Sequence, residues 1–165
     1  RPGESIKNFS RGMKAKLSIA AALSHAPQLL LLDEPTNGLD PVVRDEILDI
    51  FAEFIGDGER SILISSHITS DLERVADYIA LLDEGQLIFC EEKDALLYGY
   101  SVLKGTREQL ERLERSELIG LRETSFGFDA LVERSEENRR RFEGLVFDRC
   151  SLEEMVLYFI RGKKR

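Results

Sequence analysis

Two adjacent carboxylates, Asp33 and Glu34, directly follow a run of four leucines in this chain. An uninterrupted apolar run of this length predicts a strand that is buried on both faces, as in parallel sheets. The carboxylates then lie at the C-terminal edge of the strand, where open α/β sheets place their ligand chemistry. One acid can hold a metal ion through water, and its neighbour can act as a base. An isolated match of this kind is equally compatible with a buried strand followed by an acidic turn.

Three other segments give this pair a context. Upstream lies Asn8-Phe9-Ser10-Arg11-Gly12-Met13-Lys14, and downstream come Asn37-Gly38-Leu39-Asp40-Pro41 and Ile64-Ser65-Ser66-His67. In this order the four segments resemble the signature loop, the Walker B strand, the D-loop and the switch histidine of an ABC-type ATPase. The resemblance covers about residues 1–90 of the chain.

The resemblance implies a role for each candidate site residue. Asp33 would hold Mg²⁺ through the water shell of the ion, and Glu34 would orient and polarise the attacking water. His67 would contact the γ-phosphate of ATP. The signature loop, which would reach the nucleotide held by the opposite subunit, corresponds to Ser10, Arg11, Gly12 and Met13. The D-loop corresponds to Asn37, Gly38, Leu39 and Asp40.

The signature loop departs from the family pattern Leu-Ser-Gly-Gly-Gln, because Phe9, Arg11 and Met13 replace the leucine, the first glycine and the glutamine. The replacements keep the properties of this loop that favour the binding of an anion. A serine at a helix N-terminus offers a hydroxyl, free N–H groups and the helix dipole favour an anion, and Gly12 lets the backbone approach a phosphate. Arg11 either adds a positive charge there or faces solvent. The variant is similar to that of bacitracin-type bacterial exporters.

Each of these residues also has a purely structural alternative. Ser10 can be the N-cap of an ordinary helix, and His67 can be a structural histidine. Asp40 before Pro41 is a sound helix start, whatever other role it has.

The phosphate cradle of P-loop enzymes, Gly-x-x-x-x-Gly-Lys-Ser/Thr, does not occur in the sequence. The segment 99–106 contains the right residue types in the wrong order. We therefore expect the chain to be the C-terminal part of an ATPase that lacks the Walker A half, and to be inactive alone. Exposed apolar surface would then favour a tight or segment-swapped dimer.

Composition excludes several other classes. The net charge of −8 argues against a general nucleic-acid binder. The two cysteines, Cys90 and Cys150, match neither a zinc pattern nor a disulfide framework. The sequence has no apolar run of membrane-spanning length and no signal peptide.

The alternation of helical and strand patterns predicts an α/β fold. We expect residues 1–98 to form part of a P-loop ABC ATPase core with a largely parallel sheet, and residues 99–165 to form an appended α+β module for regulation or dimerisation. In the first region we expect a helix after Ser10, a helix from Pro41, a strand at 61–65, a capping box at Ser70 and Glu73, and a hairpin over 79–90. In the second, we expect capping boxes at Thr106/Gln109 and Ser151/Glu154, strands over 100–103, 119–121, 128–132 and 145–147, and a last helix closed by Gly162.

The leading hypothesis is the ATP-hydrolysing subunit of an ABC exporter, which uses ATP and Mg²⁺ to drive a membrane permease. The resemblance implies a second ATPase subunit in a homodimer, no nucleic-acid partner, and a peripheral position at the cytoplasmic face of the cell membrane. Two alternatives stay open, namely a non-catalytic dimerisation or regulatory module and an ABC ATPase that acts on DNA or ribosomes.

Overall fold

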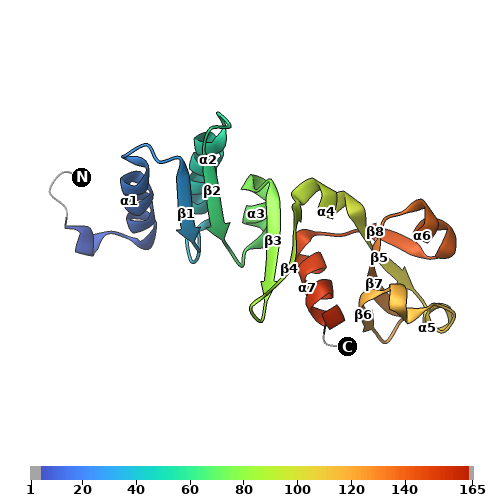
Figure 1. Ribbon diagram of the computed structural model, residues 1–165. Helices are drawn as coiled ribbons and strands as arrows, with labels where there is room; N and C mark the ends of the chain where they lie inside the picture. Colours follow the sequence, from blue (N-terminus) through green and yellow to red (C-terminus); the bar gives the residue numbers. More distant parts are fainter. Residues whose placement is uncertain (1–4, 164–165) are drawn as a thin grey trace. The chain divides into compact units, whose positions relative to one another are not determined.

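The computed structural model describes residues 5–163, which form two compact units that divide between Val75 and Ala76 (Figure 1). The first unit is built in chain order from a 3₁₀ turn and five regular elements. These are η1 (Ile6–Asn8), α1 (Arg11–Leu23), β1 (Leu29–Asp33), α2 (Pro41–Ile55), β2 (Ser61–Ser65) and α3 (Thr69–Val75).

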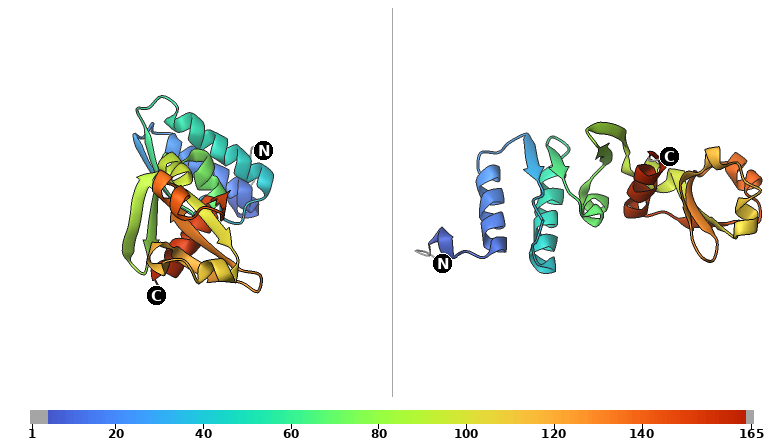
Figure 2. Two further views of the ribbon diagram at one scale, coloured as in Figure 1. Left: turned by 90° about the vertical axis from the view of Figure 1, so that its right-hand side faces the viewer. Right: turned by 90° about the horizontal axis from the view of Figure 1, so that it is seen from below.

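The two strands of the first unit pair in parallel, from Leu29 opposite Ser61 to Asp33 opposite Ser65. Helices α1 and α2 lie on the same face of this strand pair (Figure 2). The core between helices and strands contains the buried side chains of Ile19, Ile47, Leu48 and Phe51. This arrangement confirms an α/β fold with parallel strands.

The expectation that the leucine strand is buried on both faces is wrong. Leu30 is 5% exposed, whereas Leu31 is 70% and Leu63 of β2 is 67% exposed. The reason is that the helices of this unit cover one face of the strand pair, so alternate side chains face away from them. The apolar surface expected from the sequence is therefore present, while the pairing with another chain stays a prediction.

The expected capping box at Ser70 and Glu73 is also wrong, because α3 begins at Thr69 and contains Ser70. The Oγ of Ser70 instead accepts a hydrogen bond from Nη2 of Arg44 at 2.7 Å. The turn before the helix is closed by Ser66, whose Oγ accepts from the backbone N–H of Ile68 at 3.0 Å. Ser70 thus makes a tertiary contact with Arg44 instead of the helix cap that the local pattern predicts.

The second unit contains a hairpin, a four-stranded sheet and several helices. Its elements are β3 (Tyr78–Asp83), β4 (Gln86–Glu92), α4 (Lys93–Gly99), β5 (Tyr100–Gly105), α5 (Arg107–Leu110), η2 (Arg115–Glu117), β6 (Ile119–Glu123), β7 (Phe128–Glu133), α6 (Glu136–Arg141), β8 (Val146–Arg149) and α7 (Leu152–Lys163). The antiparallel hairpin β3–β4 turns through Glu84 and Gly85, which both have positive φ. The sheet has the order β6-β7-β5-β8, with every neighbouring pair antiparallel.

Local signals predicted most of this unit correctly. The capping box at Thr106 and Gln109 is present, and at the start of α7 the Ser151 N–H and the Glu154 carboxylate bond at 3.0 Å. The helix end at Gly162 is wrong, because α7 runs on to Lys163. Gly162 packs on the backbone of Gly120, where an added Cβ would lie 3.2 Å from the Gly120 nitrogen.

The hairpin β3–β4 belongs to the second compact unit, since its strands pair with one another and Phe89 of β4 contacts Phe159 of α7 at 5.2 Å between ring centroids. The domain boundary predicted after residue 98 is a different division of the chain, and it stays a prediction.

A polar network crosses the sheet where α7 packs on it. Arg122 donates a bidentate pair of hydrogen bonds to the buried carboxylate of Asp129, and Tyr158 of α7 also forms a hydrogen bond with Asp129. Burial alone would raise the pKa of Asp129, but the bonds and charge of Arg122 outweigh it and lower that pKa below 3.8. Burial, followed by the charge of Asp129, raises the pKa of the Tyr158 phenol from 10.0 to about 12.

We expect this phenol to make the second unit sensitive to alkali. The pKa of Tyr158 is higher in the folded than in the unfolded chain. The contribution of the neutral phenol to the free energy of unfolding is therefore fully present below about pH 10, and it is lost as the pH rises toward about 12. Tyr158→Phe should remove this part of the stability loss. Denaturation midpoints of both proteins measured over that range test it, and the same pH slope in the variant would show that the phenol does not contribute.

Candidate functional site

The side chains of Asp33 and Ser65 meet at the carboxyl edge of the parallel strands β1 and β2. The strand register places the two residues directly opposite one another, and Ser65 Oγ donates a hydrogen bond to Asp33 Oδ1. The serine thereby fixes the orientation of the carboxylate. Ser65 is a site residue that the sequence pattern did not single out, although it lies two residues before the predicted histidine.

Glu34 has an unusual backbone conformation, with φ of +45°. A residue with a Cβ pays about 1–2 kcal/mol for this left-handed region. The conformation is held by the Glu34 N–H, which donates to the carbonyl oxygen and to the Oγ of Ser65, each at 3.1 Å. A strained, non-glycine residue at a strand end is typical of functional sites.

The carboxylate of Glu34 reaches the imidazole of His67, with 2.7 Å between Glu34 Oε2 and His67 Nδ1. Because a carboxylate oxygen accepts, Nδ1 is the donor, which leaves Nε2 on the other side of the ring. The Glu34 side chain is 33% exposed and that of His67 is 63% exposed, so water reaches both. The structure thus brings together the two residues that the sequence predicted as catalytic.

A buried network holds the turn that follows Glu34. Asp71 of α3 accepts from Thr36 Oγ1 at 2.7 Å and from Arg44 Nε of α2 at 2.5 Å. Thr36 and Asp71 are both almost fully buried. These three residues could not be recognised from the sequence, because Asp71 is 35 positions from Thr36 and a contact at that separation leaves no local pattern.

Asp71→Asn should destabilise the first unit by about 3 kcal/mol, because it leaves the Arg44 guanidinium without its partner charge in a partly buried site. Urea unfolding followed by circular dichroism measures the change. Asp45→Asn is a matched control, since Asp45 pairs with Arg74 at an exposed position, and it should cost about 0–1 kcal/mol. Equal losses in the two variants would contradict the role of the network.

The residues assigned to the signature loop lie at the start of α1. Ser10 is its N-cap, with Oγ accepting from the Met13 N–H at 3.2 Å. Gly12 is buried against α2, where an added Cβ would lie 3.0 Å from a Val43 methyl group. In this structure the lack of a side chain at Gly12 therefore serves helix packing, and its approach to a phosphate stays a prediction.

The residues assigned to the D-loop lie between β1 and α2. The Asp40 side chain caps α2 by accepting from the Val43 N–H at 3.1 Å, which confirms its structural role. Gly38 has φ of +66°, and the Arg11 guanidinium lies against it, 2.2 Å from an ideal Cβ position. Arg11 therefore contacts this loop of its own chain. The turn is closed by Asn37 N–H to Glu34 O at 3.1 Å and Leu39 N–H to Thr36 O at 3.2 Å.

The residues at this edge fit a magnesium ion that is held mainly by water and phosphate. Within residues 5–163 there is no group of three acidic, histidine or cysteine side chains that could enclose a metal ion. Mg²⁺ keeps several waters and needs only one or two carboxylates, so an oriented Asp33 suffices.

Comparison with known proteins finds relatives for part of the chain. Over 89 residues the chain is 48% identical to a lantibiotic transport ATP-binding protein of Streptococcus pyogenes, and over 83 residues it is 46% identical to a bacitracin transport ATP-binding protein of Enterococcus faecalis. The chain is related to ABC transporter ATP-binding proteins. The matches cover 54% and 50% of this chain, and 38% and 27% of those relatives.

Two further matches describe the extent of this relationship. An ABC transporter ATP-binding protein of Bacillus subtilis is 29% identical over 96% of the chain, which spans 57% of that protein. Residues 2–70 match a family described as an AAA domain, putative AbiEii toxin, type IV TA system. The chain is thus similar to ATP-binding proteins over part of their length, as a partial ATPase fold. No described helix is long and apolar enough to cross a membrane.

Proposed function

We propose that the chain is the C-terminal part of the ATP-hydrolysing subunit of an ABC exporter, which couples ATP hydrolysis to transport by a membrane permease. The observation that supports this most directly is the contact of Glu34 with His67 at 2.7 Å, beside Asp33 at the edge of two parallel strands. The transport names of the relatives support the same proposal.

Bound Mg²⁺-ATP would supply the phosphoryl group and the counter-charge for hydrolysis. Asp33, oriented by Ser65, would hold the ion through water. Glu34 has its Oε2 engaged by His67, so Oε1 is the atom that accepts a hydrogen bond from a water molecule and draws off its proton. His67, which is held by Glu34 through Nδ1, would contact the outermost phosphate.

The remaining roles follow from the same proposal. A phosphate-binding loop outside residues 1–165 would cradle the nucleotide. Ser10 to Met13, with the free N–H groups at the start of α1, would contact nucleotide on a second ATPase subunit, and Asn37 to Asp40 would lie near that contact. The subunit would sit peripherally at the cytoplasmic face of the membrane, bound to its permease.

The test is the effect of the permease on the intact ATPase that contains this chain. We expect the ATPase to co-purify from membranes with a multi-span protein and its ATP turnover to depend on that protein. An ATPase that turns over ATP equally without any membrane protein, and that instead pellets with ribosomes or DNA, would contradict the transport proposal.

A further inference from the structure

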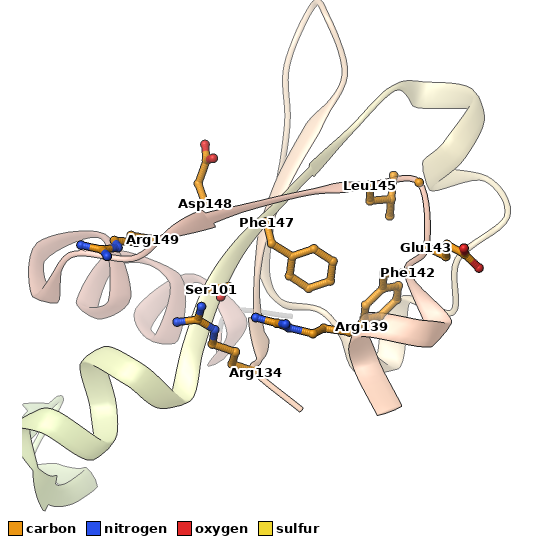
Figure 3. A pocket seen from close by; sticks show the side chains of 10 residues that line it. Ser101, Arg134, Arg139, Phe142, Glu143, Leu145, Phe147, Asp148 and Arg149 are labelled. Atoms are coloured by element: carbon orange, nitrogen blue, oxygen red, sulfur yellow. The ribbon is translucent and has the colours of Figure 1, made fainter. Parts of the chain in front are cut away.

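The second unit contains a cavity of about 360 Å³ that the proposed ATP chemistry does not use (Figure 3). It lies between the end of β7, helix α6 and strand β8, with β5 as its floor. We call it the arginine pocket, after three of its lining residues. Its lining includes Ser101, Arg134, Arg139, Phe142, Phe147 and Arg149.

The three arginines of the pocket carry uncompensated positive charge. Among the residues that the structure describes, Arg134, Arg139 and Arg149 take part in no ion pair. By contrast, four described arginines of this unit outside the pocket form ion pairs, for example Arg122 with Asp129 and Arg141 with Glu117. Like charges around one cavity repel each other, and an anion bound between them would relieve that repulsion.

The acidic residues near the pocket do not neutralise these arginines. Asp148 is paired with Lys104 at 2.6 Å. In Figure 3 the carboxylates of Asp148 and Glu143 point away from the cavity, whereas the side chain of Arg139 extends toward that of Arg134. Guanidinium groups bind phosphate through paired hydrogen bonds, and Arg134 and Arg139 both line this cavity.

The rest of the lining is suited to a ring. Phe142 is buried and Phe147 is half-buried, and both contribute to the cavity wall. The buried Ser101 adds a hydroxyl that makes no side-chain hydrogen bond within the described part of the chain. The lining combines charged and aromatic side chains, and the volume of the cavity falls in the range of about 300–1,000 Å³ that small-molecule sites have.

We propose that the arginine pocket binds a small phosphorylated ligand that carries a flat ring, such as a nucleoside monophosphate. Arg134 and Arg139 hold the phosphate, Phe147 contacts the ring, and Ser101 donates to the ligand. The site lies in the second unit and does not depend on the hydrolytic residues of the first.

Calorimetric titration of the 165-residue chain with AMP, adenosine and inorganic phosphate tests the proposal. We expect AMP to bind more tightly than phosphate, and adenosine to bind least. Equal affinity for phosphate and AMP would contradict the ring contact, equal affinity for adenosine and AMP would contradict the phosphate contact, and no binding of AMP would overturn the proposal.

Arg134→Gln with Arg139→Gln should weaken AMP binding at least about tenfold for each lost guanidinium. Arg140→Gln is the matched control, since Arg140 is the next residue of α6, is 84% exposed and does not line the pocket, and it should leave binding unchanged. Arg139→Lys keeps the positive charge but loses the bidentate hydrogen bonds of the guanidinium group. Its affinity for AMP should therefore lie between those of the wild type and the double variant. If the double variant keeps the melting temperature of the wild type and still binds AMP as tightly, the assignment is wrong.

Discussion

Glu34→Gln should lower ATP hydrolysis by the intact transporter ATPase at least about 100-fold, because the amide cannot take a proton from water. ATP binding should change little, since glutamine keeps the size and shape of the Glu34 side chain. The measurement is steady-state phosphate release at saturating Mg²⁺-ATP, together with the dissociation constant for ATP.

Glu46→Gln provides the control for this substitution. Glu46 is an exposed glutamate of α2 that pairs with Lys16, and it lies outside the cluster at the strand edge. Its replacement should leave turnover within about twofold of the wild type, because exposed ion pairs contribute about 0–1 kcal/mol. Undiminished turnover in Glu34→Gln would remove this residue from the proposed mechanism.

Gly120→Ala should destabilise the second unit by about 3 kcal/mol or more, the largest stability effect that we expect in that unit. Gly120 has φ of +60°, and an added Cβ would lie 2.0 Å from the carbonyl oxygen of Tyr158. A backbone atom in a packed helix cannot move aside as the end of a flexible side chain can. Helix α7 would therefore have to leave β6, which exposes Met155 and the network around Asp129.

Gly85→Ala separates the two causes of this effect. Gly85 has a similar positive φ of +77°, but an added Cβ there has no atom within 4 Å. Gly85→Ala should therefore lower the free energy of unfolding by only about 1–2 kcal/mol, which is the cost of placing a Cβ in the left-handed backbone region. Chemical denaturation of both variants compares them, and equal losses would show that the contact with Tyr158 does not matter.

Local chemistry explains which parts of the structure the sequence could predict. Asp40 caps the helix that begins at Pro41 through a hydrogen bond from Val43, only three positions away. Because the two partners are so close in the sequence, the local pattern is enough to predict this helix start. The same holds for the capping boxes at Thr106 and Ser151. The proximity of the residues around Asp33 to His67 was predictable, because these residues follow two parallel strands and parallel strands end at the same edge of a sheet.

The parts that were missed depend on contacts between distant segments. Asp71 was not recognised because its partners, Thr36 and Arg44, lie 35 and 27 positions away. Gly162 was taken for a helix end, although it serves the close packing of α7 on Gly120. Leu31 was taken as buried, because an apolar run does not tell which face of a strand is covered.

Under the proposed function, the edge formed by β1 and β2 is the hydrolytic half of a transporter ATPase site. Its most direct test is phosphate release from ATP by the intact, permease-bound protein with and without Mg²⁺. We predict release that requires Mg²⁺ and is lost in Asp33→Ala and in Glu34→Gln. Mg²⁺-dependent release that persists in both variants, or its absence in the folded wild-type complex, would contradict the claim.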